Sequence, residues 1–316
     1  MFTGKPLLLA PMAGISDRPF RRLAKKFGAD LTVTEMVSAQ GIVHQDRRTT
    51  DLLDLGGEPG PVITQIFGRD PEILRAAAQQ AMAYGPAAID INMGCPVKKI
   101  IKNGAGAALL KDLKQIKKIL QALSRPPAIP YTLKIRSGWD HDQLVAGQVI
   151  TLAAEFGALA VCCHPRTAKM MFSGRADWDY LEKIAAAAPL PVIGSGDLTT
   201  PEAAAAARRR PGIAALMLGR GTWGRPWLFR EVKEFLRTGR QLPPLAPREK
   251  LAIIEEHWRL LRQDKGEKIG FLLFRKHLAW YSHGLPGAAA FRRQLFATGS
   301  YPELAALTTA FFGGRS

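Results

Sequence analysis

Short runs of apolar and β-branched residues recur along the first 220 residues, and longer stretches of mixed polarity separate them. Continuous apolar runs are typical of strands buried on both faces of a parallel sheet. The intervening stretches, such as 70–85 and 200–212, begin with helix-capping residues and end with glycine, which predicts helices between the strands. The predicted strands span 7–12, 31–36, 62–67, 88–93, 131–136, 158–164, 191–196 and 214–220.

Eight strand–helix units within about 240 residues match the number and length expected for a closed (β/α)8 TIM barrel. An open, doubly wound sheet is the alternative, and it has less support because the chain shows no long crossover half-way. After the proline-rich stretch 241–247, apolar positions recur at helical spacing only, over 248–264, 268–284, 288–299 and 301–313. We therefore expect an α/β barrel over 1–242 and a small, all-helical domain over 243–316.

The charge of the chain suggests a polyanionic partner. Its 316 residues include 44 Lys and Arg against 27 Asp and Glu, a formal net charge of +17. An excess of this size attracts nucleic acid, although a basic protein without such a partner is the alternative. Three cysteines, two of them adjacent, cannot form a disulfide framework and indicate a reducing compartment. We expect a cytoplasmic monomer with no membrane segment and no obligate protein partner.

Polar residues follow the predicted strands, at the end of the barrel where this fold carries its chemistry. A packed core would not accept so many of them. The predicted ring comprises Pro11, Met12, Ala13, Glu35, Met36, Gln65, Asn92, Cys95, Lys134, Arg136, His164, Arg166, Ser195, Gly196, Asp197, Gly219 and Arg220.

Two glycine-containing turns, GSGD at 194–197 and GRG at 219–221, follow the last two predicted strands. In this fold such turns bind phosphate through backbone N–H groups. Lys134 at the end of the fifth strand needs a nearby anion, which is either a ligand or an internal partner such as Glu35. With His164 as a second cationic donor and the amide of Gln65, the set fits a flavin mononucleotide (FMN).

Cys95 lies in the segment DINMGCPVKK (90–99), between a glycine and a proline and directly after a strand. A thiol with an ordinary pKa of about 8.5 is mostly protonated near neutral pH and can donate a proton to a substrate at the barrel mouth. Cys162 and Cys163 lie within a predicted strand and fit buried, inert cysteines better. No other cysteine or histidine stands at ligand spacing from Cys95, so we expect no metal site there.

The motifs PMAGISDRPFR, VTEM, DINMGCP, LKIRSGW, HPRT, LGRGTWGRPW and RKHLAWY together resemble the tRNA-dihydrouridine synthases, in particular the bacterial B-type subgroup. The resemblance covers nearly the whole chain. It implies a flavin oxidoreductase that carries FMN, uses NADPH as reductant and reduces a uridine in tRNA to 5,6-dihydrouridine. A uridine in folded RNA must be flipped out to reach a barrel mouth, so the basic helical tail is expected to bind tRNA.

The resemblance also assigns roles to residues of the ring. Cys95 would protonate C5 of the uracil, and Asn92 would hold the edge of the base. FMN would be bound by Pro11, Met12, Ala13, Gln65, Lys134, His164, Arg166, Ser195, Gly196, Asp197, Gly219 and Arg220. The candidate contacts to tRNA are Lys98, Lys99, Arg275, Lys276, Arg292 and Arg293. Ser195 and Pro165 depart from the family's usual Asn and Gly, and Pro165 removes a backbone N–H.

Two other classes of protein explain part of the sequence. A small-molecule FMN oxidoreductase of the dihydroorotate dehydrogenase type accounts for the polar ring, but not for the net charge or the helical tail. A basic RNA-binding protein without catalysis accounts for the charge, but leaves Cys95 and the ring without a role.

Overall fold

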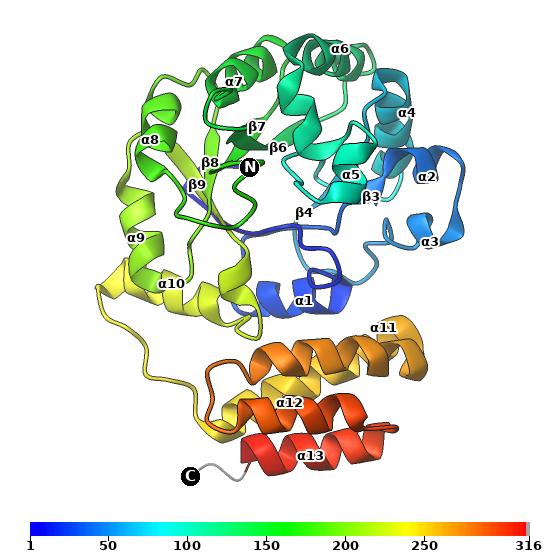
Figure 1. Ribbon diagram of the computed structural model, residues 1–316, viewed down its shortest axis with the longest axis vertical. Coiled ribbons are helices and arrows are strands. Elements are labelled where there is room, and N and C mark those ends of the chain that lie inside the picture. Colours follow the sequence, from blue (N-terminus) through cyan, green and yellow to red (C-terminus); the bar gives the residue numbers. More distant parts are fainter. Residues whose placement is uncertain (314–316) are drawn as a thin grey trace.

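The computed structural model describes residues 1–313, apart from the side chain of Arg48, and its larger part is a closed barrel of parallel strands (Figure 1). β1 pairs with both β2 and β9, and β2 also pairs with β4, so the ring of strands is complete. The barrel strands are β1 (Leu7–Leu9), β2 (Leu31–Val33), β4 (Val62–Phe67), β5 (Ala88–Met93), β6 (Tyr131–Gly138), β7 (Ala160–Thr167), β8 (Val192–Ser195) and β9 (Ile213–Leu218). The predicted TIM barrel is confirmed, and the open sheet is excluded.

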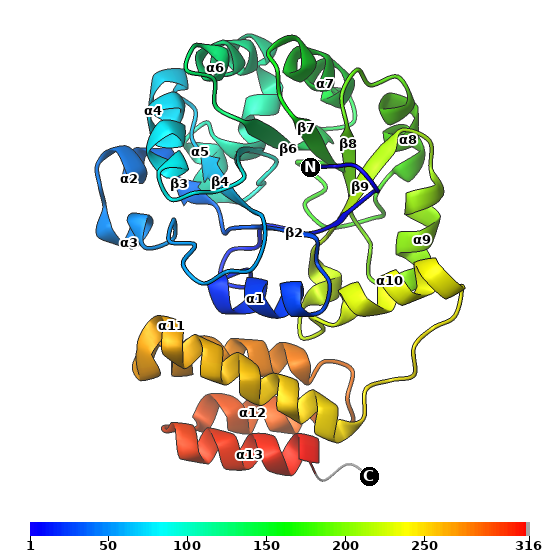
Figure 2. The ribbon, with the colours of Figure 1, turned by 180° about the vertical axis from the view of Figure 1, so that it is seen from behind.

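Helices follow the strands and surround the barrel (Figure 2). They are α1 (Arg18–Lys26), α2 (Ala39–Val43), α3 (Arg47–Thr50), α4 (Pro71–Met82), α5 (Lys98–Lys102), α6 (Leu113–Ser124), α7 (Ala146–Glu155), α8 (Trp178–Ala186), α9 (Pro201–Arg209) and α10 (Leu228–Thr238). A short strand, β3 (Val37–Ser38), extends the sheet beside β4, and the 3-10 turns are η1 (Gly106–Lys111) and η2 (Arg220–Thr222). Among residues 1–313, no helix is both long and apolar enough to span a membrane.

Local sequence sets where the barrel helices begin. The Asp70 side chain accepts hydrogen bonds from the backbone N–H groups of Glu72 and Ile73, both at 2.9 Å, and Pro71 occupies the first helical position of α4. Such a cap satisfies N–H groups that have no partner within the helix, and proline there forfeits no hydrogen bond. α9 begins in the same way after Thr200. The helices predicted within 70–85 and 200–212 are therefore confirmed.

The barrel interior changes from apolar to polar towards the C-terminal ends of the strands. Side chains alternate along a strand, so residues two apart share a face. Ala88 on β5 belongs to the apolar interior cluster, with Leu8, Leu31, Ile63, Ala160, Cys162, Ile193 and Ala215. Two and four residues further along β5 come Asp90 and Asn92, which bond to other interior side chains. The fold thus presents polar groups at one end, as the ring of strand-end residues predicts.

The remaining helices pack together beside the barrel. They are α11 (Pro247–Tyr281), α12 (Ala288–Ala297) and α13 (Tyr301–Gly313), with a cluster of buried residues that includes Ile254, Trp258, Leu261, Phe274, Leu278, Leu295 and Leu304. Gly266, at φ 73°, breaks α11 into two helices, which correspond to the predicted stretches 248–264 and 268–284. The predicted helical domain runs to residue 316, and its last three residues lie outside the described chain.

The helical bundle lies on the side of the barrel that carries α1 and α10 (Figures 1 and 2), and α11 contacts α1. Lys26 on α1 forms an ion pair with Glu256 at 2.5 Å, and Arg18 forms one with Asp264. The Nζ atom of Lys276 donates to the carbonyl of Gly14 at 2.9 Å. These contacts connect α11 to the segment that follows β1, a part of the barrel that also lines the site described next.

A buried cluster of Asp17, His257 and His277 lies at the same junction. The Nε2 atom of His277 is 3.7 Å from Asp17 Oδ2, and the possible ligand atoms of all three residues lie within 4.8 Å of one another. Burial alone would raise the pKa of Asp17, but the two histidines and the backbone N–H of Phe20 hold that pKa below its usual value. The cluster is therefore a buried electrostatic contact between the barrel and the helical bundle.

Candidate active site

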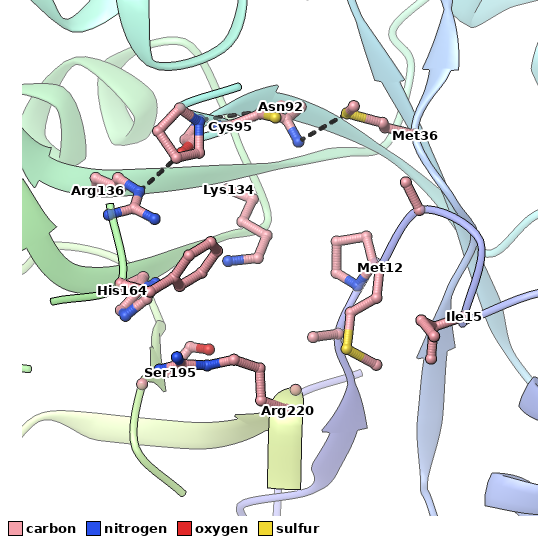
Figure 3. A pocket seen from close by; sticks show the side chains of 18 of the residues that line it. Met12, Ile15, Met36, Asn92, Cys95, Lys134, Arg136, His164, Ser195 and Arg220 are labelled. Carbon is pink, nitrogen blue, oxygen red and sulfur yellow. Dashed lines mark hydrogen bonds between the residues drawn. The ribbon is translucent and has the colours of Figure 1, made fainter. Parts of the chain in front are cut away.

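A pocket opens at the C-terminal ends of the strands, and most of the predicted ring lines it (Figure 3). The ring residues in its wall are Pro11, Met12, Ala13, Met36, Gln65, Asn92, Cys95, Lys134, Arg136, His164, Ser195, Gly196, Asp197, Gly219 and Arg220. Two members of the predicted ring, Glu35 and Arg166, do not line it. Glu35 accepts a hydrogen bond from the backbone N–H of Gly14.

Lys134 points into the open space between His164 and Met12 (Figure 3). Within residues 1–313 its ammonium group has no hydrogen-bonding or ion-pair partner, and Glu35, the internal partner considered from sequence, is engaged elsewhere. Asp90, deeper in the barrel, interacts electrostatically with the positive charge of Lys134 but does not form an ion pair with it. A half-buried cation without a paired carboxylate favours an anionic ligand, because burial removes the water that would otherwise solvate the charge.

Arg166 donates hydrogen bonds to two residues that line the pocket, Asp197 and His164. Its side chain is 2% exposed and donates to Asp197 at 2.8 Å and to Nε2 of His164 at 3.1 Å. Burial alone would raise the pKa of Asp197, but the hydrogen bonds from Arg166 and from the backbone N–H of Ala176 lower it below its usual value. Asp197 is thus a carboxylate already occupied by protein donors. Arg166, predicted to bind the flavin, instead contacts residues that line the pocket.

His164 differs from the expected cationic donor. Burial, followed by the charges of Lys134, Arg136, Arg166 and Arg220, lowers its pKa well below the usual value, so the ring is neutral near pH 7. Arginine can only donate, so Nε2 of His164 accepts from Arg166 and the ring proton is placed on Nδ1. His164 is therefore a neutral ring in the pocket wall, and the correction follows from its burial and from the four cations around it.

The turns after β8 and β9 form the part of the wall expected to bind phosphate. Gly196 has a φ of 115°, and a Cβ atom there would lie 2.7 Å from the His164 ring, so only glycine fits. Arg220 lies 3.3 Å from Asp197 and packs over the ring of Phe172. Ser195 turns its hydroxyl to the carbonyl of Met217 at 3.0 Å. The backbone of this turn and the guanidinium of Arg220 are the groups that remain available for an anion.

Cys95 sits on a loop between β5 and α5, with its main chain fixed on both sides. Its N–H donates to Asn92 Oδ1 at 2.9 Å, and its carbonyl accepts from Ala107 N–H at 3.0 Å. Arg136 donates to the carbonyl of Gly94 at 3.0 Å, and a Cβ at Gly94 would lie 3.2 Å from the backbone of β6. The glycine before the cysteine therefore eases the close approach of the loop to the next strand, where a side chain would be crowded.

The surroundings of Cys95 keep its thiol protonated. Burial raises the pKa of Cys95, and the backbone N–H of Val97 and the charges of Arg136 and Lys134 offset this only in part. Cys162 and Cys163 are fully buried within β7, away from solvent, as expected. A protonated thiol that lines an open pocket is able to act as a general acid.

Comparison with known proteins identifies the family of this chain. Residues 8–311 match the family model described as "Dihydrouridine synthase (Dus)". A tRNA-dihydrouridine synthase B from Pseudomonas aeruginosa is 42% identical over 288 residues, which cover 91% of this chain and 87% of that one. The chain belongs to the dihydrouridine synthase family. The predicted family and its classification as an oxidoreductase enzyme are thereby confirmed.

Other dihydrouridine synthases are similar over most of their length. The tRNA-dihydrouridine synthase B of Vibrio cholerae is 40% identical, with 91% of this chain and 89% of that one covered. A probable tRNA-dihydrouridine synthase of Rickettsia prowazekii is 36% identical, with 90% and 88% covered.

Two aromatic residues of the pocket wall, Phe172 and Trp223, were not predicted from the sequence. Phe172, on the loop after β7, is 51% exposed and lies beneath the guanidinium groups of both Arg136 and Arg220. Trp223 donates from its indole N–H to the sulfur of Met12 at 2.9 Å. Loop aromatics of this kind have no periodic signal in the sequence, so only their place in the folded chain identifies them.

The predicted tRNA contacts of this synthase-family chain fall into two groups. Lys98, Lys99 and Arg293 are exposed, and Arg292 is half-buried. Arg275 and Lys276 are engaged within the protein: Arg275 lies 3.4 Å from the carbonyls of Phe296 and Thr298, and Lys276 donates to the carbonyl of Gly14 in the loop after β1.

Proposed function

We propose that this protein binds FMN and reduces a uridine in tRNA to 5,6-dihydrouridine, with NADPH as reductant. The observation that carries the proposal is the Cys95 thiol, protonated and placed on the wall of a pocket that also holds the unpaired ammonium of Lys134. The comparisons support tRNA as substrate, because the relatives are named for that activity.

The residues present fit FMN. The glycine turn at Gly196 leaves room for a close approach of backbone N–H groups, and Arg220 adds a positive charge for the phosphate. Lys134 and the neutral imidazole of His164 would face the ring system, where the cation favours the negative charge of the reduced form. The apolar part of the pocket wall consists of Pro11, Met12 and Ala13. Gln65 and Gly219 also line the pocket and belong to the proposed FMN site. When bound, FMN supplies the hydride that C6 of the uracil accepts.

Cys95 completes the reduction from the protein side. Its Sγ–H donates a proton to C5 of the uracil, so that one hydride and one proton saturate the C5–C6 bond and a thiolate remains. A proton from solvent then restores the thiol. Arg136 and Lys134 limit the cost of the transient thiolate, because both lower the pKa of Cys95. The raised pKa keeps the thiol protonated before the transfer and favours its reprotonation afterwards.

We also propose that residues 243–316 form the tRNA-binding domain and that the monomer acts in the cytoplasm. Lys98 and Lys99 beside the cysteine loop, with Arg292 and Arg293 on α12, have side chains free to contact phosphates. Arg275 and Lys276 contribute by holding the bundle together and against the barrel. The net charge of +17 supports a polyanionic substrate.

The test uses purified protein, FMN, NADPH and a tRNA transcribed in vitro, which carries no modified bases. We expect dihydrouridine to form with NADPH oxidation, and Cys95→Ala to lose that activity while Cys163→Ala keeps it. Reduction of a free pyrimidine with no product in tRNA would assign the protein to the small-molecule class instead. Binding of tRNA without any flavin or dihydrouridine would assign it to the non-catalytic class.

A further inference from the structure

A row of polar side chains crosses the barrel interior beneath the pocket. Gln65 on β4, Asp90 on β5 and Thr132 on β6 are register neighbours on adjacent strands, and each is at most 2% exposed. The hydroxyl of Thr132 donates to Asp90 Oδ1 at 2.6 Å, and Nε2 of Gln65 donates to Asp90 Oδ2 at 2.7 Å. Both carboxylate oxygens of Asp90 therefore accept a hydrogen bond from a neighbouring strand.

The row continues upward to the cysteine loop. Oε1 of Gln65 accepts from Nδ2 of Asn92 at 2.9 Å. Oδ1 of Asn92 in turn accepts from the backbone N–H groups of Cys95, at 2.9 Å, and Gly94, at 3.2 Å. An unbroken chain of hydrogen bonds thus connects the carboxylate of Asp90 to the main chain of Cys95.

This series of hydrogen bonds has one direction, which Asp90 fixes at one end and the backbone N–H groups of Gly94 and Cys95 fix at the other. Oδ2 of Asp90 accepts from the NH2 group of Gln65, so the amide oxygen of Gln65 faces Asn92. Asn92 must then turn its own NH2 group towards Gln65, which leaves its oxygen for the N–H of Cys95. If Gln65 were reversed, Asn92 would also reverse, and its NH2 group would face the N–H of Cys95 without an acceptor.

A purely structural role does not account for this row. The register pair one step deeper, Ile63 and Ala88, is apolar, as is Ala160 beside Thr132, and these positions pack without any polar group. Removing a carboxylate from water is unfavourable, and burial accordingly raises the pKa of Asp90, against the hydrogen bonds of Thr132 and Gln65. Apolar residues of similar shape are often at least as stable as a buried charged group.

We propose that Asp90 is a positioning residue for Cys95, acting through Gln65 and Asn92. The proposal rests on the proposed role of Cys95 as proton donor. The cysteine loop has no side-chain cap at Val97, the residue that precedes α5, so Asn92 is the side chain that fixes the N–H side of Cys95. A displaced proton donor loses rate steeply, by about 100-fold for a shift of about 1 Å.

Three variants separate orientation from stability. Asp90→Leu keeps the shape but removes the acceptor, so the amide of Gln65 loses the group that orients it. Asp90→Asn keeps an oxygen towards Gln65, because its NH2 group can donate to the hydroxyl oxygen of Thr132. Thr132→Val is the matched control, since it leaves a buried carboxylate oxygen without a donor and lowers stability, yet leaves Gln65, Asn92 and Cys95 connected as before.

The first measurement is the single-turnover oxidation of pre-reduced, FMN-loaded enzyme by unmodified tRNA, beside flavin content and Tm. We expect Asp90→Leu to slow this step by about 10- to 100-fold in enzyme saturated with FMN. Asp90→Asn should stay within about 3-fold of the parent, and Thr132→Val should lower Tm without slowing the step. Equal losses in Asp90→Asn and Asp90→Leu, or rates that follow Tm across all three variants, would overturn the proposal.

The second measurement does not depend on uridine reduction. Iodoacetamide alkylates an accessible thiol, and Cys162 and Cys163 are buried, so mass spectrometry reports the reaction of Cys95. We expect Asp90→Leu to change the alkylation rate of Cys95 by at least about 3-fold, with the other two variants at the parent rate. An unchanged rate in Asp90→Leu contradicts the positioning role. A changed rate in a protein whose parent form does not reduce tRNA would leave the positioning role standing and refute the proposed function instead.

Discussion

Replacing Cys95 with alanine isolates the proton-donating step, because the loop does not depend on the sulfur. Two hydrogen bonds fix the residue: its N–H donates to Oδ1 of Asn92, and its carbonyl accepts from the N–H of Ala107. Both use main-chain atoms of residue 95, so they survive the change to alanine. FMN binding and flavin reduction by NADPH should therefore be unchanged. Uridine reduction should fall by about 10²- to 10⁴-fold, the usual effect of losing a general acid. That loss corresponds to about 3 to 5 kcal/mol of transition-state stabilisation.

The pH dependence follows from the direction of the pKa shift. A general acid must be protonated, and burial raises the pKa of Cys95 above its ordinary value. The uridine step should stay constant through neutral pH and fall only above about 8.5, the ordinary cysteine pKa, as the thiol ionises. Cys95→Ala should lack this alkaline decline, because no thiol remains to ionise.

The assay reduces FMN-loaded enzyme with NADPH in the absence of oxygen, mixes it with unmodified tRNA and follows flavin absorbance over pH 6 to about 10. Cys163→Ala is the control, since that thiol is fully buried and does not line the pocket. A Cys95→Ala enzyme that oxidises at the parent rate, or that keeps the same alkaline decline, would refute Cys95 as the donor.

Three further outcomes follow from the structure. Lys134→Met should weaken FMN binding by about 10- to 100-fold in a flavin fluorescence titration, because a charged hydrogen bond contributes about 1.5 to 3 kcal/mol; an unchanged Kd would remove Lys134 from the flavin site. Gly212→Ala should lower Tm by more than about 4 °C in calorimetry, since its Cβ would lie 2.3 Å from the backbone of α8, whereas Gly57→Ala, in open space at a similar φ, should cost less. Arg292→Glu with Arg293→Glu should weaken tRNA binding and flatten its salt dependence in a mobility-shift titration, with flavin content intact; a parent-like salt slope would exclude this face of α12 as a phosphate contact.

The sequence predicted the barrel and most of the pocket because the two share one physical cause. Parallel strands buried on both faces read as apolar runs, and the polar residues that end those runs must lie at one rim. The same reasoning placed Glu35 and Arg166 in the pocket, because both stand at strand ends. The structure covers them instead, Glu35 by the loop at Gly14 and Arg166 by the loop that ends at Gly174. Loop conformation, which the periodic pattern does not encode, decides whether a strand-end residue reaches the ligand.

Phe172 and Trp223 were missed for the complementary reason. Each is an aromatic residue in an irregular segment, and its position depends on contacts with Arg220 or Met12 that are distant in sequence. The hydrogen-bonded row behind Cys95 was also not foreseen as a unit, although Gln65 and Asn92 were named as separate pocket residues. Register between strands brought them together, and register cannot be read from one strand alone.

The junction between barrel and bundle bears directly on how the tail can be tested. From sequence, Arg275 and Lys276 are two adjacent cations on an amphipathic helix and are expected to contact tRNA. In the structure Lys276 holds the carbonyl of Gly14, two residues after Met12 in the pocket wall, and its neighbour His277 faces Asp17. Reversing the charge of Lys276 would disturb the pocket as well as the bundle. A loss of tRNA binding in that variant would therefore have two causes, whereas Arg292 and Arg293 lie on α12, which does not contribute to the pocket lining.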